Sequence, residues 1–190
     1  MHRLVSWRVW LASAAVFVVF AGIFFASSAP FAVSQVEAIC GEAPLDVRFT
    51  SSAADVERFL DGCGPAGRDA YRNMQLADLF YPLVVGLFLA SSLALVLSRL
   101  FPNRPSIVGW AAVPLIASGF DYLENAFAWA ALRTFPEPAA TNSLLGVASA
   151  AKTTLSWCAG VLLLLSVGAI VVRGGRARMA RRNVVAAGLR

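Results

Sequence analysis

Four long apolar stretches, separated by polar and proline-containing connections, dominate the hydropathy pattern of the chain. They run over about residues 10–29, 78–100, 107–132 and 144–172. A transmembrane helix needs about 20 mostly apolar residues to cross roughly 30 Å of hydrocarbon. An open strand cannot satisfy its backbone hydrogen bonds in lipid. The pattern therefore predicts an all-α polytopic membrane protein, a bundle of four transmembrane helices that forms a single membrane domain over residues 1–190.

The composition agrees with a membrane protein. Hydrophobic residues make up 58% of the chain and charged residues 14%, whereas soluble domains have about 45–50% and about 25%. So few charges could not cover a soluble globule of 190 residues, which argues against an ordinary soluble enzyme. The only histidine is His2, so the sequence shows no metal-ligand spacing, and we expect neither a metal nor a cofactor.

Arginines are distributed unequally among the connections. Arg3 and Arg8 precede the first span and six arginines lie in the tail 173–190, whereas the loop 30–77 has seven acids and four arginines. The positive-inside rule therefore places both termini in the cytoplasm and the loop 30–77 outside. The net charge of +5 is thus a topology signal. A nucleic-acid partner is not expected, because the chain lacks a soluble basic face with stacking aromatics.

The outer loop 30–77 is expected to form a small helical cap on the bundle. Ser52 with Asp55 three residues later is typical of a helix start. The glycines and proline of residues 62–67 predict the end of that helix. A second helical stretch, residues 68–76, is expected to run straight into the second span.

Two cysteines of this loop, Cys40 and Cys63, are predicted to form a disulfide. Both lie on the side that the arginine distribution places outside, where oxidising conditions favour the bond. Loop-closure entropy would make it worth roughly 3 kcal/mol. Two reduced thiols are the alternative.

Several polar residues lie inside or at the edge of the apolar spans. An ionised side chain at mid-membrane costs roughly 2.5–3.5 kcal/mol on insertion scales. Positions 121, 124 and 125 share one helical face, and counting 1.5 Å per residue from the outer helix ends places the whole set in the outer half of the bilayer. We expect one cluster, in which acids of the third span meet the only lysine of the chain and two residues of the second span form the rim. Its members are Asp121, Glu124, Asn125 and Lys152, with Asp78 and Tyr81 at the rim.

Two interpretations of this cluster stay open. It is either a binding or proton-handling site, or an interhelical salt-bridge network that fixes helix packing. Three acids against one lysine leave an excess of negative charge that a purely structural bridge would not need. The first function hypothesis is a protein that binds or processes an amphiphilic small molecule or lipid. The alternative is a non-catalytic accessory or assembly subunit of a membrane complex.

The sequence does not decide whether the chain is an enzyme, and it identifies no catalytic residue. The lipid bilayer is the partner that the apolar spans require. A homo-oligomer and a complex with another membrane protein both remain open as further assemblies.

Three stretches and one single residue resemble a group of small uncharacterised bacterial four-span membrane proteins. They are the run Ala-Tyr-Arg at 70–72, the run Asp-Leu-Phe-Tyr-Pro at 78–82, the run Phe-Asp-Tyr-Leu-Glu-Asn at 120–125, and Lys152. The resemblance covers roughly residues 50–170, and the Asp-Tyr-Leu-Glu-Asn run is its most specific part. It implies a location in the bacterial cytoplasmic (inner) membrane and brings no established activity with it.

Overall fold

The computed structural model describes the backbone of residues 7–188 and the side chains of residues 7–176 and 179. Every regular element in this part of the chain is helical. Four segments are long and apolar enough to cross a membrane: Trp7–Ala26, Gly64–Leu100, Pro105–Thr134 and Asn142–Arg176. The prediction of an all-α polytopic bundle is therefore confirmed. His2, Arg3 and Arg190 lie outside the described residues.

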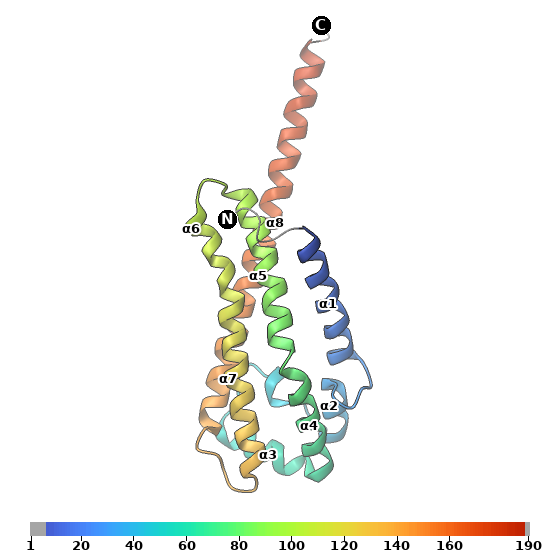
Figure 1. The fold of residues 1–190 in the computed structure, drawn as a ribbon, viewed down its shortest axis with the longest axis vertical. Coiled ribbons are helices and arrows are strands. Elements are labelled where there is room, and N and C mark those ends of the chain that lie inside the picture. The colour runs from blue at the N-terminus through green and yellow to red at the C-terminus, as the bar shows by residue number, and fades with distance from the viewer. Residues whose placement is uncertain (1–6, 189–190) are drawn as a thin grey trace.

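Helix α5 (Tyr81–Leu100) occupies the centre of the bundle (Figure 1). It contacts α1 (Trp7–Ala26) on one side, and α7 (Val113–Thr134) and α8 (Asn142–Gly188) on the other. A short helix α6 (Pro105–Val108) and the 3-10 turn η2 (Gly109–Ala112) connect α5 to α7. Alanines and serines are frequent among the buried residues of α7 and α8, and such small residues let two helices approach closely.

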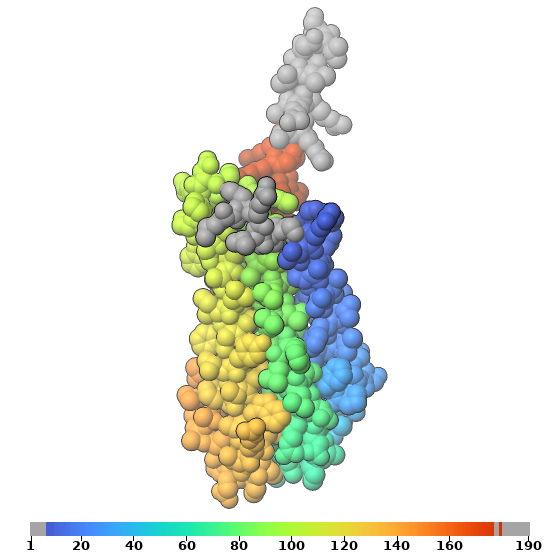
Figure 2. Space-filling model, in the orientation of Figure 1, coloured from blue at the N-terminus to red at the C-terminus, as the bar shows by residue number. Residues whose placement is uncertain are grey.

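Helix α1 is apolar around its whole circumference, and Phe24 is its only buried residue. A helix of this kind suits a lipid environment. Its contacts to α5 include the stacked rings of Phe17 and Phe88, with centroids 4.7 Å apart. The indole N–H of Trp10 also donates to the Ser92 hydroxyl at 2.8 Å. Figure 2 shows α1 lying along one flank of α5.

Residues 30–78 form a cap over one end of the bundle, drawn at the bottom of Figure 1. The cap consists of α2 (Val33–Cys40), the 3-10 turn η1 (Leu45–Val47), α3 (Ala53–Gly62) and α4 (Gly64–Asp78). Phe59 and Tyr71 of the cap are fully buried and share one hydrophobic core with Leu132 of α7 and Leu145 of α8. The cap is therefore packed onto the ends of two transmembrane helices.

The cap approaches α8 most closely at Gly146. A Cβ built on Gly146 would collide with the backbone of Ser51, so only glycine fits there. The Thr50 hydroxyl donates to the Gly146 carbonyl at 3.2 Å. Backbone contact replaces side-chain packing at this point.

Two predictions for the cap are confirmed. Asp55 N–H donates to the Ser52 hydroxyl at 3.2 Å, and Ser52 N–H donates to the Asp55 carboxylate at 2.9 Å, which makes a capping box at the start of α3. The Ser52 hydroxyl and backbone N–H are the main reasons why the pKa of Asp55 falls from 3.8 to about 2. Cys40 and Cys63 form a disulfide with an S–S distance of 2.08 Å. This bond joins the end of α2 to the junction of α3 and α4.

Helix α3 ends at Gly62, within the segment 62–67 where its end is predicted. The expected start of the second helical stretch at residue 68 is wrong, because the helix starts four residues earlier. Helix α4 begins at Gly64, one residue after the C-cap of α3, because Gly64 adopts a φ of +62° that favours glycine. Pro65 lies in the first turn of α4, where a missing N–H leaves no helical acceptor unpaired. The glycine-rich segment therefore turns the chain directly into the next helix.

The expectation that the second helical stretch runs straight into the second span is also wrong. Helix α4 ends at Asp78, the chain turns at Leu79 and Phe80, and α5 begins at Tyr81. Pro82 explains the break, because proline cannot donate to the carbonyl four residues earlier and its ring clashes with that carbonyl. The acceptor left free is the carbonyl of Asp78.

The basic segment 173–190 was expected as a tail beyond the last span. The backbone of α8 remains helical to Gly188, for a total of 47 residues, which at 1.5 Å per residue is roughly 70 Å. Figure 1 shows this helix extending far beyond the end of the bundle opposite the cap. Arg173 donates to the Leu100 carbonyl at 3.1 Å and so satisfies the last turn of α5.

Candidate functional site

The break between α4 and α5 is stabilised by polar side chains of α7. Asn125 donates its amide to the Asp78 carbonyl at 3.1 Å, Tyr122 donates its hydroxyl to the Leu79 carbonyl at 3.0 Å, and Ser118 donates to the Pro82 carbonyl at 2.6 Å. These α7 residues are four and three positions apart and so lie along one side of the helix. Asn125 thus has a structural role, because it satisfies a carbonyl that Pro82 leaves without its helical donor.

The acids of α7 meet Lys152 of α8, as the helical spacing led us to expect. The Lys152 ammonium lies 2.9 Å from Asp121 and also forms an ion pair with Glu124. Ser149, one turn before Lys152, donates to the other oxygen of Glu124. The Lys152 side chain is only 15% exposed. It therefore stays inside the bundle and does not extend to the surface.

A fourth acid, Asp46 of η1, was not singled out by the sequence. Its carboxylate accepts the Tyr71 hydroxyl at 2.6 Å and the Gln75 amide at 2.7 Å. Tyr71 and Gln75 lie one turn apart on α4. The cap folds Asp46 inward, where it is buried. The site therefore contains four carboxyl groups and one lysine.

Asp78 is more buried than a position at the rim of the cluster would suggest. It is 3% exposed and lines the same cavity as Asp46, Asp121 and Lys152. Among the described residues, no cationic side chain comes within ion-pair distance of Asp78 or Asp46. The cluster is therefore divided into an ion-paired part on α7 and α8 and an uncompensated part beneath the cap.

The cavity beside these acids has a volume of about 580 Å³. It lies between α1, the cap, α5, α7 and α8, and its lining combines charged and polar side chains with a larger apolar surface. The lining residues are Phe24, Phe25, Val33, Asp46, Val47, Met74, Asp78, Tyr81, Val85, Asp121, Lys152, Thr153, Ser156 and Trp157. Glu124 and Asn125 are not among them, and both are almost completely buried behind the cavity.

The cavity lies between the lipid-facing sides of two transmembrane helices. Phe25 of α1 is 40% exposed and Trp157 of α8 is 71% exposed, and both line the cavity. Both belong to segments that are long and apolar enough to cross a membrane. The geometry therefore allows lateral access from the lipid, between α1 and α8.

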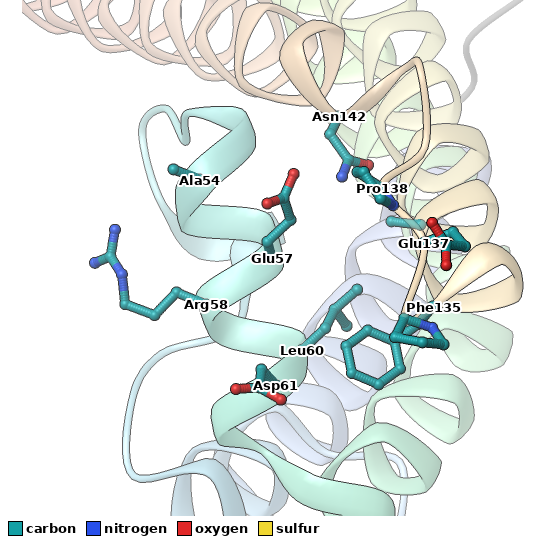
Figure 3. Close-up of a pocket in the computed structure, with 11 residues that line it drawn as sticks. Ala54, Glu57, Arg58, Leu60, Asp61, Phe135, Glu137, Pro138 and Asn142 are labelled. Carbon is teal, nitrogen blue, oxygen red and sulfur yellow. The ribbon is translucent and has the colours of Figure 1, made fainter.

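A second cavity, of about 400 Å³, lies between α3 and the connection of α7 to α8. Figure 3 shows Glu57 pointing from α3 toward Asn142, whereas Arg58 points away on the other side of α3. Glu137 lies on the opposite wall from Glu57. None of the predicted cluster residues lines this cavity.

Metal ligation has no geometric basis in the described part of the chain, where no three His, Cys, Asp or Glu side chains are grouped to hold an ion. Comparison of the chain with protein-family models, with curated proteins and with solved structures finds no match. The interpretation of the site therefore depends on its own geometry, and the resemblance carried by residues 121–125 stays a prediction.

Proposed function

We propose that this protein binds an amphiphilic small molecule or lipid in the cavity lined by Asp78, Asp121 and Lys152, and that the ligand enters sideways from the bilayer. The observation that carries the proposal is a cavity whose lining combines charged and polar side chains with apolar ones, among them the exposed Phe25 and Trp157 of two membrane-spanning helices. Such a lining matches a molecule with a polar head and a hydrocarbon tail.

The size and position of the cavity support this function. A volume of about 580 Å³ lies within the range of roughly 300–1,000 Å³ that is usual for small-molecule sites. Ionisable groups within a membrane segment are expensive and usually functional. A lateral opening also lets an apolar tail reach the site without passing through water.

We place the protein in the bacterial cytoplasmic membrane, with the cap on the outer side and both termini in the cytoplasm. The arginine-rich segment after α8 and the acid-rich cap support this orientation through the positive-inside rule. The disulfide between Cys40 and Cys63 supports it independently, because such bonds persist in oxidising compartments. The ligand would then come from the outer leaflet.

The alternative, a non-catalytic accessory subunit whose buried charges specify packing, is favoured most by Glu124. Glu124 is completely buried, is bound by Ser149 and Lys152, and does not line the cavity. This closed arrangement is what a structural ion pair requires. It does not account for Asp78 and Asp46, which line the cavity and have no cationic partner among the described residues.

A binding experiment with a filled cavity tests the proposal. The protein in nanodiscs is titrated calorimetrically with three amphiphiles that share a dodecyl chain and carry an ammonium, a maltoside or a sulfate head, with empty nanodiscs as the blank. At least one should saturate at one molecule per chain. The variant Thr153→Phe/Ser156→Phe, which narrows the cavity, should lower its affinity at least tenfold.

The matched control is Leu164→Phe, which adds a ring to α8 at a side chain that is 73% exposed and outside the cavity. It should bind like the unchanged protein. Absence of saturable binding for all three amphiphiles, or equal binding by the filled and unfilled cavities, would refute the proposed function.

A further inference from the structure

We infer that the ligand of this cavity carries a cationic head group, an alkylated ammonium, held by the carboxylates of Asp78 and Asp46. The inference rests on the proposed function and specifies its ligand class. The inference follows from a comparison of the charged groups of the cluster: some of them are already paired within the protein and others are not.

Lys152 is not free to receive an anionic head group. Its ammonium is paired with Asp121 at 2.9 Å and with Glu124. Removing it from either carboxylate would leave that acid buried without a cation, which is strongly unfavourable. An anionic ligand would therefore compete with two contacts that already satisfy the lysine.

Asp78 and Asp46 have the opposite situation. Asp46 accepts hydrogen bonds from two neutral donors, Tyr71 and Gln75. The Asn125 amide is the neutral donor at the Asp78 side chain, and neither acid has a cation within ion-pair distance among the described residues. Asp78 is 3% exposed and faces the cavity. A buried carboxylate needs a compensating charge or hydrogen bonds, and a ligand cation between these two acids would supply the charge.

The backbone favours the same sign of charge. Asp78 is the last residue of α4, a helix of 15 residues. The C-terminal end of a helix carries partial negative charge, which stabilises cations and disfavours anions. The dipole of α4 therefore adds to the field of the two carboxylates that line the cavity.

The apolar side chains of the cavity lining favour an organic cation over an inorganic one. Tyr81 stacks on Phe24 with ring centroids 5.4 Å apart, and both rings line the cavity. An ammonium within roughly 6 Å of a ring face gains cation–π energy, and its alkyl chain can fill the space toward Trp157. An inorganic divalent ion would instead require several converging oxygen ligands.

The test compares head groups at constant tail length. Dodecyltrimethylammonium, dodecyl maltoside and dodecyl sulfate are titrated into the protein in nanodiscs below their micelle-forming concentrations, and partitioning into empty nanodiscs is subtracted. The ammonium should bind at least tenfold more tightly than the maltoside. The sulfate should bind least.

Two variants locate the head group. Asp78→Asn should lower the affinity for the ammonium roughly tenfold to a hundredfold, which corresponds to the loss of one charge-assisted contact. Its affinity for the maltoside should stay within about twofold of that of the unchanged protein. Asp46→Asn should act in the same direction, and circular dichroism confirms that its cap remains folded. Asp61→Asn removes an exposed carboxylate of α3 outside the cavity and serves as the matched control.

The outcomes separate this inference from the proposed function. Equal binding of the maltoside and the ammonium, tighter binding of the sulfate, or unchanged ammonium affinity in Asp78→Asn would overturn the cationic head group while the binding function stands. Binding of none of the three would overturn both.

Discussion

Replacing Lys152 with methionine tests how the buried charges of α7 and α8 are balanced. The substitution keeps the length and apolar stem of the side chain and removes only the cation. In the folded protein this ammonium pairs with both Asp121 and Glu124. Its loss leaves two carboxylates side by side in the bundle, whereas Glu124→Gln leaves the contact of 2.9 Å between Lys152 and Asp121 intact.

Lys152→Met should therefore lower the free energy of unfolding more than Glu124→Gln does. Breaking a buried ion pair by removing one partner costs about 3–5 kcal/mol, so Lys152→Met should lower the free energy of unfolding by that amount. Glu124→Gln loses one charge-assisted contact, worth about 1.5–3 kcal/mol. The double variant should be less destabilised than the sum of the two, with a coupling energy of about 1–3 kcal/mol.

Unfolding by a denaturing detergent in mixed micelles, followed by tryptophan fluorescence and circular dichroism, measures these free energies. The control is Arg58→Met, which removes a cation that is 69% exposed and paired with Asp55; exposed pairs are worth about 0–1 kcal/mol. Equal effects of Lys152→Met and Glu124→Gln, or effects no larger than that of Arg58→Met, would refute the view that Lys152 bridges two buried acids.

Three further predictions concern the cap and its contact with α8. Gly146→Ala should lower the midpoint of thermal unfolding, because the added Cβ meets the backbone of Ser51. The control Gly160→Ala, in the same helix, adds a Cβ that meets nothing within 4 Å and should be neutral or stabilising. A lower midpoint for Gly160→Ala than for Gly146→Ala would contradict the close approach of the cap to α8. Ser52→Ala should lower stability by about 1 kcal/mol through loss of the capping box, as measured by detergent unfolding. Because the pKa of Asp55 is lowered, its contribution to stability is present above the ordinary value of 3.8 and is lost as the pH falls toward about 2. Asp55→Asn should therefore make the free energy of unfolding less dependent on pH across that window. An unchanged pH dependence in Asp55→Asn would count against the hydrogen bonds between Ser52 and Asp55.

The charged part of the site could be predicted because it lies on regular helices. Asp121 and Glu124 share a helical face, and counting residues from the helix ends brings Lys152 to the same depth. Apolar spans also limit where a charge can be tolerated, so the few exceptions are conspicuous. The agreement therefore follows from helical periodicity and from the chemistry of the bilayer.

The remaining part of the site could not be predicted, because it depends on how an irregular segment folds back. Asp46 lies in a short 3-10 turn and meets Tyr71 and Gln75, which are 25 and 29 residues away. No periodicity connects such positions. The burial of Asp78 at the end of α4 depends likewise on the break that Pro82 imposes. The sequence does not show that Asn125 binds the Asp78 carbonyl that this break leaves free.

The burial of Lys152 has a practical consequence for following the protein in a native membrane. Lys152 is the only lysine of the chain, so its ammonium is the only side-chain amine that an acylating reagent can modify. In the folded state that amine is paired with Asp121 and Glu124 and lines the cavity, so a reagent reaches it through the cavity. The rate at which one amide forms at this position thus measures, without any introduced label, how accessible the cavity is, and a bound ligand should lower that rate.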